Sequence, residues 1–184
     1  MKLISRKVLA VGAACLAATI GWAQIERLDL GQMVVRADNA VHGKIVASKV
    51  TRIDHPRDGV ELYFTTLTIE GRSVYTGAQL KVDVSFPGGF IDATRGVYNS
   101  EAPSADDQKV GNEIVAFYKW SDNMGGDFAS NALYASHGGL FRVASAKNGS
   151  EVVLGRGEGY AISSNLKISE LDQRVAQIRQ QQPK

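Results

Sequence analysis

One segment near the middle of the chain alternates strictly between apolar and polar side chains. Apolar residues occupy every second position from 80 to 86, and charged or hydroxyl-bearing residues fill the positions between them. The residues of this run are Leu80, Lys81, Val82, Asp83, Val84, Ser85 and Phe86. Because successive side chains of a strand point to opposite faces, the pattern predicts a β-strand with one buried face.

Two earlier segments also have the composition of strands, but their apolar phase slips. In 60–70 the apolar positions shift around Thr65 and Thr66, and in 41–53 they shift after Ala47. A β-bulge or a sharply coiled strand produces such a slip, so we expect one or the other here. A turn rich in Pro, Asp and Gly over 54–59 separates the two strands.

Further strand signals follow toward the C-terminus. Residues 114–120 are nearly all apolar, which predicts a central strand covered on both faces. Segments 140–143 and 151–154 flank the dipeptide Asn148-Gly149, which adopts the positive φ angles of a tight turn, so they predict a β-hairpin. The stretch 87–111 is polar and rich in Asp, Ser and Gly, which is typical of a long functional loop.

Helical signals are confined to the two ends of the exported chain. Ser169 is expected to cap a helix over 168–182, and Asp29 is expected to cap a short helix that runs from Leu30 to about Ala37. Both segments space their apolar residues as an amphipathic helix does. The inward-facing residues are Met33, Val34 and Ala37 in the first helix and Ile168, Leu171, Val175 and Ile178 in the second.

The first 23 residues have the composition of a secretory signal peptide. A basic start precedes an apolar run over 8–20, and small residues occupy both positions of a cleavage motif that ends at Ala23. That run is shorter than the roughly 20 apolar residues that span a bilayer, so we expect no transmembrane segment after cleavage. The sequence thus predicts an exported protein of the periplasm or the medium, with a single domain over 24–184.

Cleavage changes the charge and the redox chemistry of the chain. Loss of the three basic residues of the leader lowers the formal net charge from +2 to −1. This charge argues against nucleic acid as a partner, because phosphate backbones require a concentrated basic face. Cys15, the only cysteine, is removed as well, so we expect no disulfide. Lipoprotein anchoring through Cys15 is the less favoured alternative, because Gly12 stands where an aliphatic residue is usual.

A glycine pair follows the alternating strand directly, within Pro87, Gly88, Gly89 and Phe90. A phosphate-binding loop would lead into a helix and carry a suitably placed lysine or hydroxyl, and neither feature is present. Chain reversal at the end of the strand is therefore the favoured interpretation. The second interpretation is a recognition loop beside a sheet edge, with these four residues and His137 as candidate partner-binding residues.

The sequence shows no local motif for catalysis or metal binding. It lacks the Gly-x-Ser-x-Gly nucleophile motif, and Ser136 and His137 are direct neighbours, which point to opposite faces when they lie on a strand. His42, His55 and His137 are far apart, and no cysteine remains to complete a zinc site. We predict no catalytic residue, no metal ligand and no cofactor, while assembly of a metal site from distant residues stays open.

Acidic and aromatic clusters have simple structural interpretations. Residues 122–127 lack the alternating ligands and terminal glutamate of a calcium loop, so they predict a solvated turn. Phe117, Tyr118 and Trp120 lie on the predicted central strand, where core packing explains them without a stacked ligand.

Several short strings carry a resemblance to a known group of proteins. They are ADNAVHGKIV at 37–46, YTG at 75–77, VDV and PGG within 82–89, and VGNEIVAF at 110–117. In this order they resemble the motifs of a family of uncharacterised secreted bacterial proteins, over roughly residues 28–145. Such proteins are similar to the oligosaccharide/oligonucleotide-binding (OB) barrel of netrin-like domains and tissue inhibitors of metalloproteinases. Together with the helical signals at both ends, the resemblance implies a mainly β fold, a small Greek-key, OB-like barrel with a short N-terminal helix and a C-terminal amphipathic helix.

The inhibitory mechanism of that class does not transfer to this chain. Those inhibitors chelate zinc with an N-terminal cysteine, whereas the processed chain would begin at Gln24 and contain no thiol. We predict a secreted, non-enzymatic binding or interaction protein with a protein or glycan partner, an extracellular protease among the candidates. The alternatives are a hydrolase built from dispersed residues such as Glu113, Asp127 and His137, and an envelope structural protein.

Overall fold

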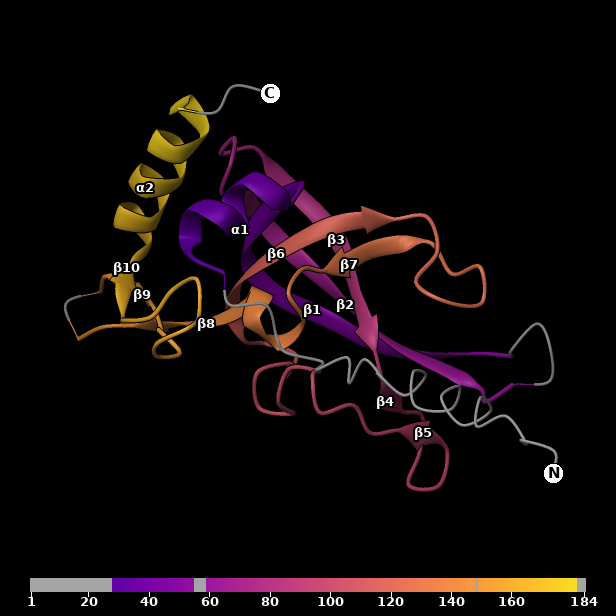
Figure 1. Ribbon diagram of the computed structural model, residues 1–184. Helices are drawn as coiled ribbons and strands as arrows, with labels where there is room; N and C mark the ends of the chain where they lie inside the picture. Colours follow the sequence, from indigo (N-terminus) through magenta and orange to yellow (C-terminus); the bar gives the residue numbers. More distant parts are fainter. Residues whose placement is uncertain (1–27, 55–58, 148, 182–184) are drawn as a thin grey trace, which may run out of the picture.

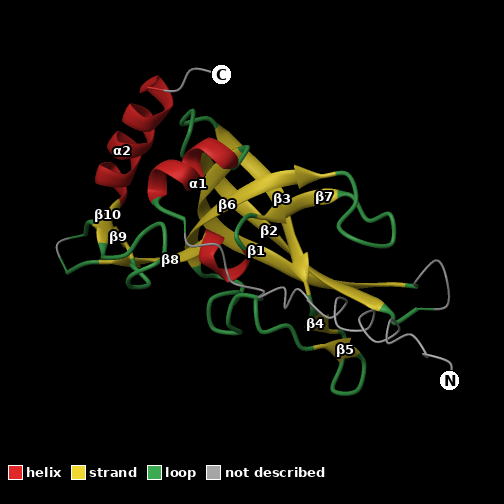
Figure 2. Cartoon of the chain, viewed as in Figure 1, coloured by secondary structure: helices red, strands yellow, loops and turns green. Residues whose placement is uncertain are grey.

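The computed structural model describes residues 28–54, 59–147 and 149–181. The predicted signal peptide with Cys15, and also His55 and Asn148, lie outside these residues. The described chain is mainly β, with one short helix near its start and a longer helix at its end, which confirms the predicted fold class (Figure 2). Neither described helix has the length and apolar run that a membrane crossing needs.

Five strands close into a small barrel (Figure 1). They are β1 (Asn39–Ile53), β2 (Leu62–Ser73), β3 (Gln79–Pro87), β6 (Glu113–Ser121) and β7 (Ser130–Leu133). The order around the barrel is β1-β2-β3-β7-β6, and an additional pairing of β1 with β6 closes the ring. Only the β3–β7 pair within this ring is parallel, and every other pair is antiparallel.

Shorter elements extend and cover the barrel. The sheet continues from β6 through β8 (Leu140–Ser145), β9 (Glu151–Val153) and β10 (Leu166–Lys167), and the predicted hairpin is β8 with β9. A 3-10 helix, η1 (Ser136–Gly139), precedes β8. The polar stretch 87–111 contains a separate two-stranded sheet, β4 (Gly89–Phe90) with β5 (Gly96–Val97). The helices are α1 (Leu30–Arg36) and α2 (Ile168–Gln181).

Strand β6 lies between two hydrophobic cores, which explains its continuous apolar run. Ile114, Ala116 and Tyr118 point into the barrel, where they meet Val41, Ile45 and Leu67 among others. Val115 and Phe117 point outward into a second core, which α1, α2, β8 and β9 share. The prediction of a strand covered on both faces is confirmed, since all residues from 114 to 118 are buried.

The phase slips have two different causes. In β1 a register shift against β2 lies between Ile45 and Ala47, which is a bulge of the kind predicted. In β2 the pairing is continuous, and Phe64 is buried although it is out of phase with Leu67, because its ring stacks on Phe128 of the loop between β6 and β7, with ring centroids 4.9 Å apart. The slip in β2 therefore reflects cover from outside the barrel and not a bulge.

Both helices attach their apolar stripes to the outer core. Asp29 caps α1, since its carboxylate accepts a hydrogen bond from the Gln32 amide at 2.7 Å, as predicted. Ile168, Leu171 and Val175 of α2 are buried. The predicted N-cap at Ser169 is wrong, because α2 begins at Ile168, directly after β10 has paired with β9. Ser169 therefore lies within the first turn.

The three aromatic residues of β6 divide into two groups. Phe117 packs edge-on against Phe141, with ring centroids 6.4 Å apart, and Tyr118 is also buried. The assignment of Trp120 to the core is wrong, because its side chain is 53% exposed. β6 has left the buried region at that point, and the Trp120 indole N–H donates to Asp122 Oδ1 at 2.6 Å.

Candidate functional site

Pro87, Gly88, Gly89 and Phe90 lead from the end of β3 into β4, the first strand of the β4–β5 hairpin. Gly88 and Gly89 have φ angles of +97° and +127°, which side chains with a Cβ adopt only with strain. Three hydrogen bonds hold this entry: Gly88 N–H to Tyr63 O at 2.7 Å, Thr65 Oγ1 to Gly88 O at 2.8 Å, and Asn99 Nδ2 to Pro87 O at 3.1 Å. Gly88 thus continues the pairing with β2, and the chain reverses further on, between Phe90 and Gly96 of the hairpin that the glycine pair opens.

The tip of the β4–β5 hairpin is also internally bonded. The Asp92 carboxylate accepts hydrogen bonds from the Thr94 and Arg95 amides and from the Arg95 guanidinium. The Arg95 hydrogen bond, supported by those of Thr94, lowers the pKa of Asp92 below its ordinary value. The Ile91 amide donates to Arg95 O at 2.8 Å across the turn. The polar groups of the tip are therefore occupied within the hairpin.

Apolar side chains project from this bonded frame into solvent. Phe90 is 54% exposed, Ile91 42%, Val97 39% and Tyr98 79%. They belong to β4, β5 and the residues next to these strands, on the side of the molecule away from α1 and α2 (Figure 1). We call these four residues the apolar tip. Groups of exposed apolar side chains are typical of interaction surfaces.

His137 holds the segment that follows the β4–β5 hairpin. Its amide donates to Glu101 O at 2.8 Å, its Nδ1 lies 3.2 Å from the same oxygen, and its Nε2 lies 3.0 Å from the Tyr160 hydroxyl. The Glu101 amide in turn donates to the side chain of Asn99, which holds Pro87. His137 lies in η1, and it positions the chain that follows β5.

A second group of side chains, unsignalled by any sequence motif, lies on the outer face of the extended sheet. It consists of His42 on β1, Glu113 on β6 and Glu151 on β9. His42 pairs with Val115, which shares its face with Glu113, and the ladder continues through β8 to Glu151 on that same face. We call these three residues the His42 cluster.

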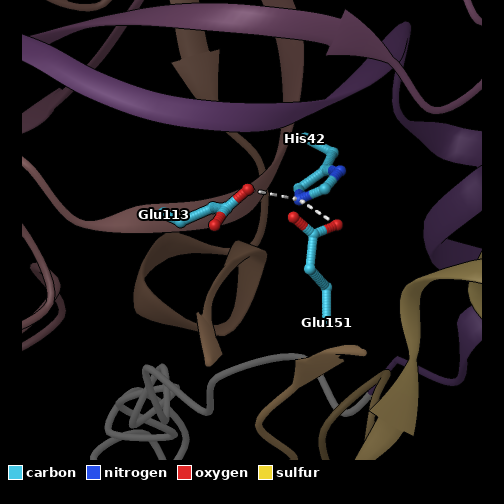
Figure 3. A group of neighbouring side chains, drawn as sticks. All are labelled: His42, Glu113 and Glu151. Atoms are coloured by element: carbon cyan, nitrogen blue, oxygen red, sulfur yellow. Dashed lines mark ion pairs between the residues drawn. The ribbon is translucent and has the colours of Figure 1, made fainter. Parts of the chain in front are cut away.

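The two carboxylates of the His42 cluster converge on one ring nitrogen (Figure 3). His42 Nε2 lies 3.2 Å from Glu113 Oε1 and 3.9 Å from Glu151 Oε2. The His42 side chain is only 7% exposed, whereas Glu113 is 38% and Glu151 43% exposed. Although both carboxylates are near, their directions from the ring do not fit a hydrogen bond to Nε2. This nitrogen therefore has no hydrogen-bond partner among the described residues. One imidazole and two carboxylates are a donor set for a divalent transition metal.

The residues of the hydrolase alternative lie in separate places. Glu113 begins β6, His137 belongs to η1 before β8, and Asp127 lies beyond the far end of β6 in the loop to β7. Asp127 Oδ1 accepts a hydrogen bond from Asn123 at 3.2 Å, within the predicted turn. The fold therefore joins Glu113 to His42 and does not join it to Asp127 or His137.

Comparisons with known proteins return no relative: no protein-family model, curated protein or solved structure matches this chain.

Proposed function

We propose that this protein is an exported, non-enzymatic interaction protein that binds a partner protein through the apolar tip. The observation that carries the proposal is the combination of a rigid hairpin frame with exposed side chains at Phe90, Ile91, Val97 and Tyr98. A pre-organised loop loses little conformational entropy when it binds, and buried aromatic anchors supply much of the affinity of an interface. The composition of residues 1–23 supports export to the periplasm or the medium.

The chemistry of the apolar tip favours a protein over a glycan. Sugar recognition requires free polar groups around the aromatic ring, but Asp92 and Arg95 are bonded to one another at the tip. Two aliphatic and two aromatic side chains fit an apolar pocket on a protein surface. An extracellular protease is one partner of this kind, engaged through the loop because the chain would present no N-terminal cysteine.

The strand order supports an OB-like barrel of the kind found in netrin-like domains. Five strands close through the β1–β6 pairing, and β3 runs parallel to β7. OB barrels bind ligands at the face of their second and third strands and at the loops after their first and fourth strands, so the apolar tip, which follows the third barrel strand, would be a separate binding surface.

The test is capture of a partner from the culture fluid of the native host by the tagged protein, followed by mass spectrometry and titration of the purified partner. The double variant Phe90→Ser/Tyr98→Ser should lose binding by roughly 2 kcal/mol or more, as interface anchors do. Val110→Ser is the matched control, because Val110 is 59% exposed but lies outside the hairpin. Equal capture by the double variant and the wild type would refute the proposal.

A substrate panel addresses the hydrolase alternative. The wild-type protein should show no turnover of esters, peptides or glycans. Turnover that disappears in an alanine variant of Glu113, Asp127 or His137 would replace the proposed function with an enzymatic one.

A further inference from the structure

The unpartnered nitrogen of His42 requires a physical explanation. Buried polar atoms in proteins are almost always hydrogen-bonded, and an exception indicates a bound water, an ion or a functional role. Here the atom lies within 3.9 Å of two carboxylate oxygens and satisfies hydrogen-bond geometry with neither. A cation between the three groups would use the nitrogen lone pair and neutralise both carboxylates at once.

The spacing of the three ligand atoms agrees with a tetrahedral metal. Zn²⁺ bonds of about 2.0–2.1 Å in tetrahedral geometry place ligand atoms about 3.3 Å apart. The candidate ligand atoms all lie within 4.8 Å of one another, and the His42–Glu113 separation is already 3.2 Å. Only Glu151 has to move by about an ångström to reach the tetrahedral spacing of about 3.3 Å, and its 43% exposed side chain has the freedom to do so.

We propose that His42, Glu113 and Glu151 form a binding site for one Zn²⁺ ion. A neutral imidazole and two carboxylates supply three ligands, and the exposed side of the two glutamates leaves the fourth position to water. Ca²⁺ and Mg²⁺ fit this site poorly, because they take mainly oxygen ligands and a larger number of them.

The surroundings leave the two glutamates to His42. Arg72 is the cross-strand neighbour of His42 on β2, but its guanidinium binds Asp172 of α2 through two hydrogen bonds of 2.7 and 3.1 Å. Lys44 stands opposite Glu113 in the β1–β6 register and is exposed. Because the ligands come from β1, β6 and β9, the ion would tie the barrel wall to the β8–β9 extension. This site is independent of the apolar tip.

The experiment is Zn²⁺ titration of the protein prepared without a histidine tag, by calorimetry and native mass spectrometry. We expect one ion per wild-type chain and a higher midpoint of thermal unfolding with Zn²⁺. Changing a residue that merely supports a metal ligand costs roughly 10–100-fold in affinity, so Glu113→Gln/Glu151→Gln should lose at least that much. Glu158→Gln is the matched control, since Glu158 is exposed in the loop after β9.

A histidine readout separates this site from adventitious binding. Zn²⁺ should shift the ring resonances of His42 and leave those of His137 unchanged, because both His137 nitrogens already have partners. Glutamine keeps the size of glutamate and His42 stays in place, so the double variant should keep the wild-type circular dichroism spectrum. Equal zinc affinity in the double variant, absence of a His42 shift, or preference for Ca²⁺ would each overturn the proposal.

Discussion

Gly89→Ala tests whether the β4–β5 hairpin is locked against the barrel. Gly89 has a φ of +127°, where an L-residue costs about 1–3 kcal/mol. A Cβ at this position would overlap Thr65 Oγ1 and lie 3.0 Å from Val50 Cγ2. Thr65 would have to rotate and give up its hydrogen bond to Gly88 O, which is worth about 1 kcal/mol. We therefore expect a total loss of about 2–4 kcal/mol in the stability of the hairpin.

Two measurements report this loss at different levels. Urea unfolding gives the global free energy, and hydrogen exchange of the Ile91 amide, which bonds Arg95 O, reports opening of the hairpin itself. If the hairpin detaches before the barrel unfolds, the exchange rate rises while the global free energy changes less. Either result shows that Gly89 holds the hairpin in place.

Two further variants isolate the steric part. Gly77→Ala is the control, because Gly77 has a φ of +75° but an added methyl would meet nothing within 4 Å, so only the backbone cost of about 1–2 kcal/mol applies. In a Thr65→Ala background the overlap with Oγ1 disappears, and Gly89→Ala should then cost less by about 1 kcal/mol. Equal losses for Gly89→Ala and Gly77→Ala in both assays would refute the reasoning.

Two other changes test contacts that position the helix and the hairpin tip. Asp172→Asn should lower the unfolding free energy by about 1 kcal/mol, less at high salt, because it weakens the two-point contact with half-buried Arg72. Glu170→Gln, whose ion pair stays within α2, should cost less, and an equal loss would contradict the assignment. Arg95 lowers the pKa of Asp92, so the ionised carboxylate stabilises the folded tip at pH values above 3.8, which is its ordinary pKa. This contribution disappears as the pH falls below 3.8. An NMR titration of the turn amides should find the midpoint below 3.8, and a midpoint at or above this value would exclude the effect.

The sequence predicts those features that depend on local pattern. Residues 80–86 alternate and become β3, and residues 114–118 are apolar throughout because β6 faces a core on each side. Asp29 caps α1 through a contact three residues away, so the signal and the structure share one short segment.

The errors arise where a distant segment decides the environment. Phe64 is buried because Phe128, 64 residues further along the chain, stacks on its ring, and a phase slip cannot distinguish such cover from a bulge. Trp120 is exposed because β6 leaves the core before its last residues. Ser169 loses the cap position because β10 carries the chain into α2 without an intervening residue.

The His42 cluster shows why strand register, and not composition, sets the limit of sequence reasoning. Its residues stand on β1, β6 and β9, and they share a face only because His42 pairs with Val115 and Ser145 pairs with Glu151. A slip of one residue in either pairing would turn a glutamate to the opposite face of the sheet. The β1–β6 ladder ends at Lys44, just before the register shift of β1. The bulge therefore changes which side chains of β1 face outward only beyond Ile45, and His42 keeps its face. Glu113 and Glu151, both more than 70 positions from His42 in the sequence, thus lie beside it because of strand pairing. Such a group cannot be recognised from the spacing of residues in one local motif.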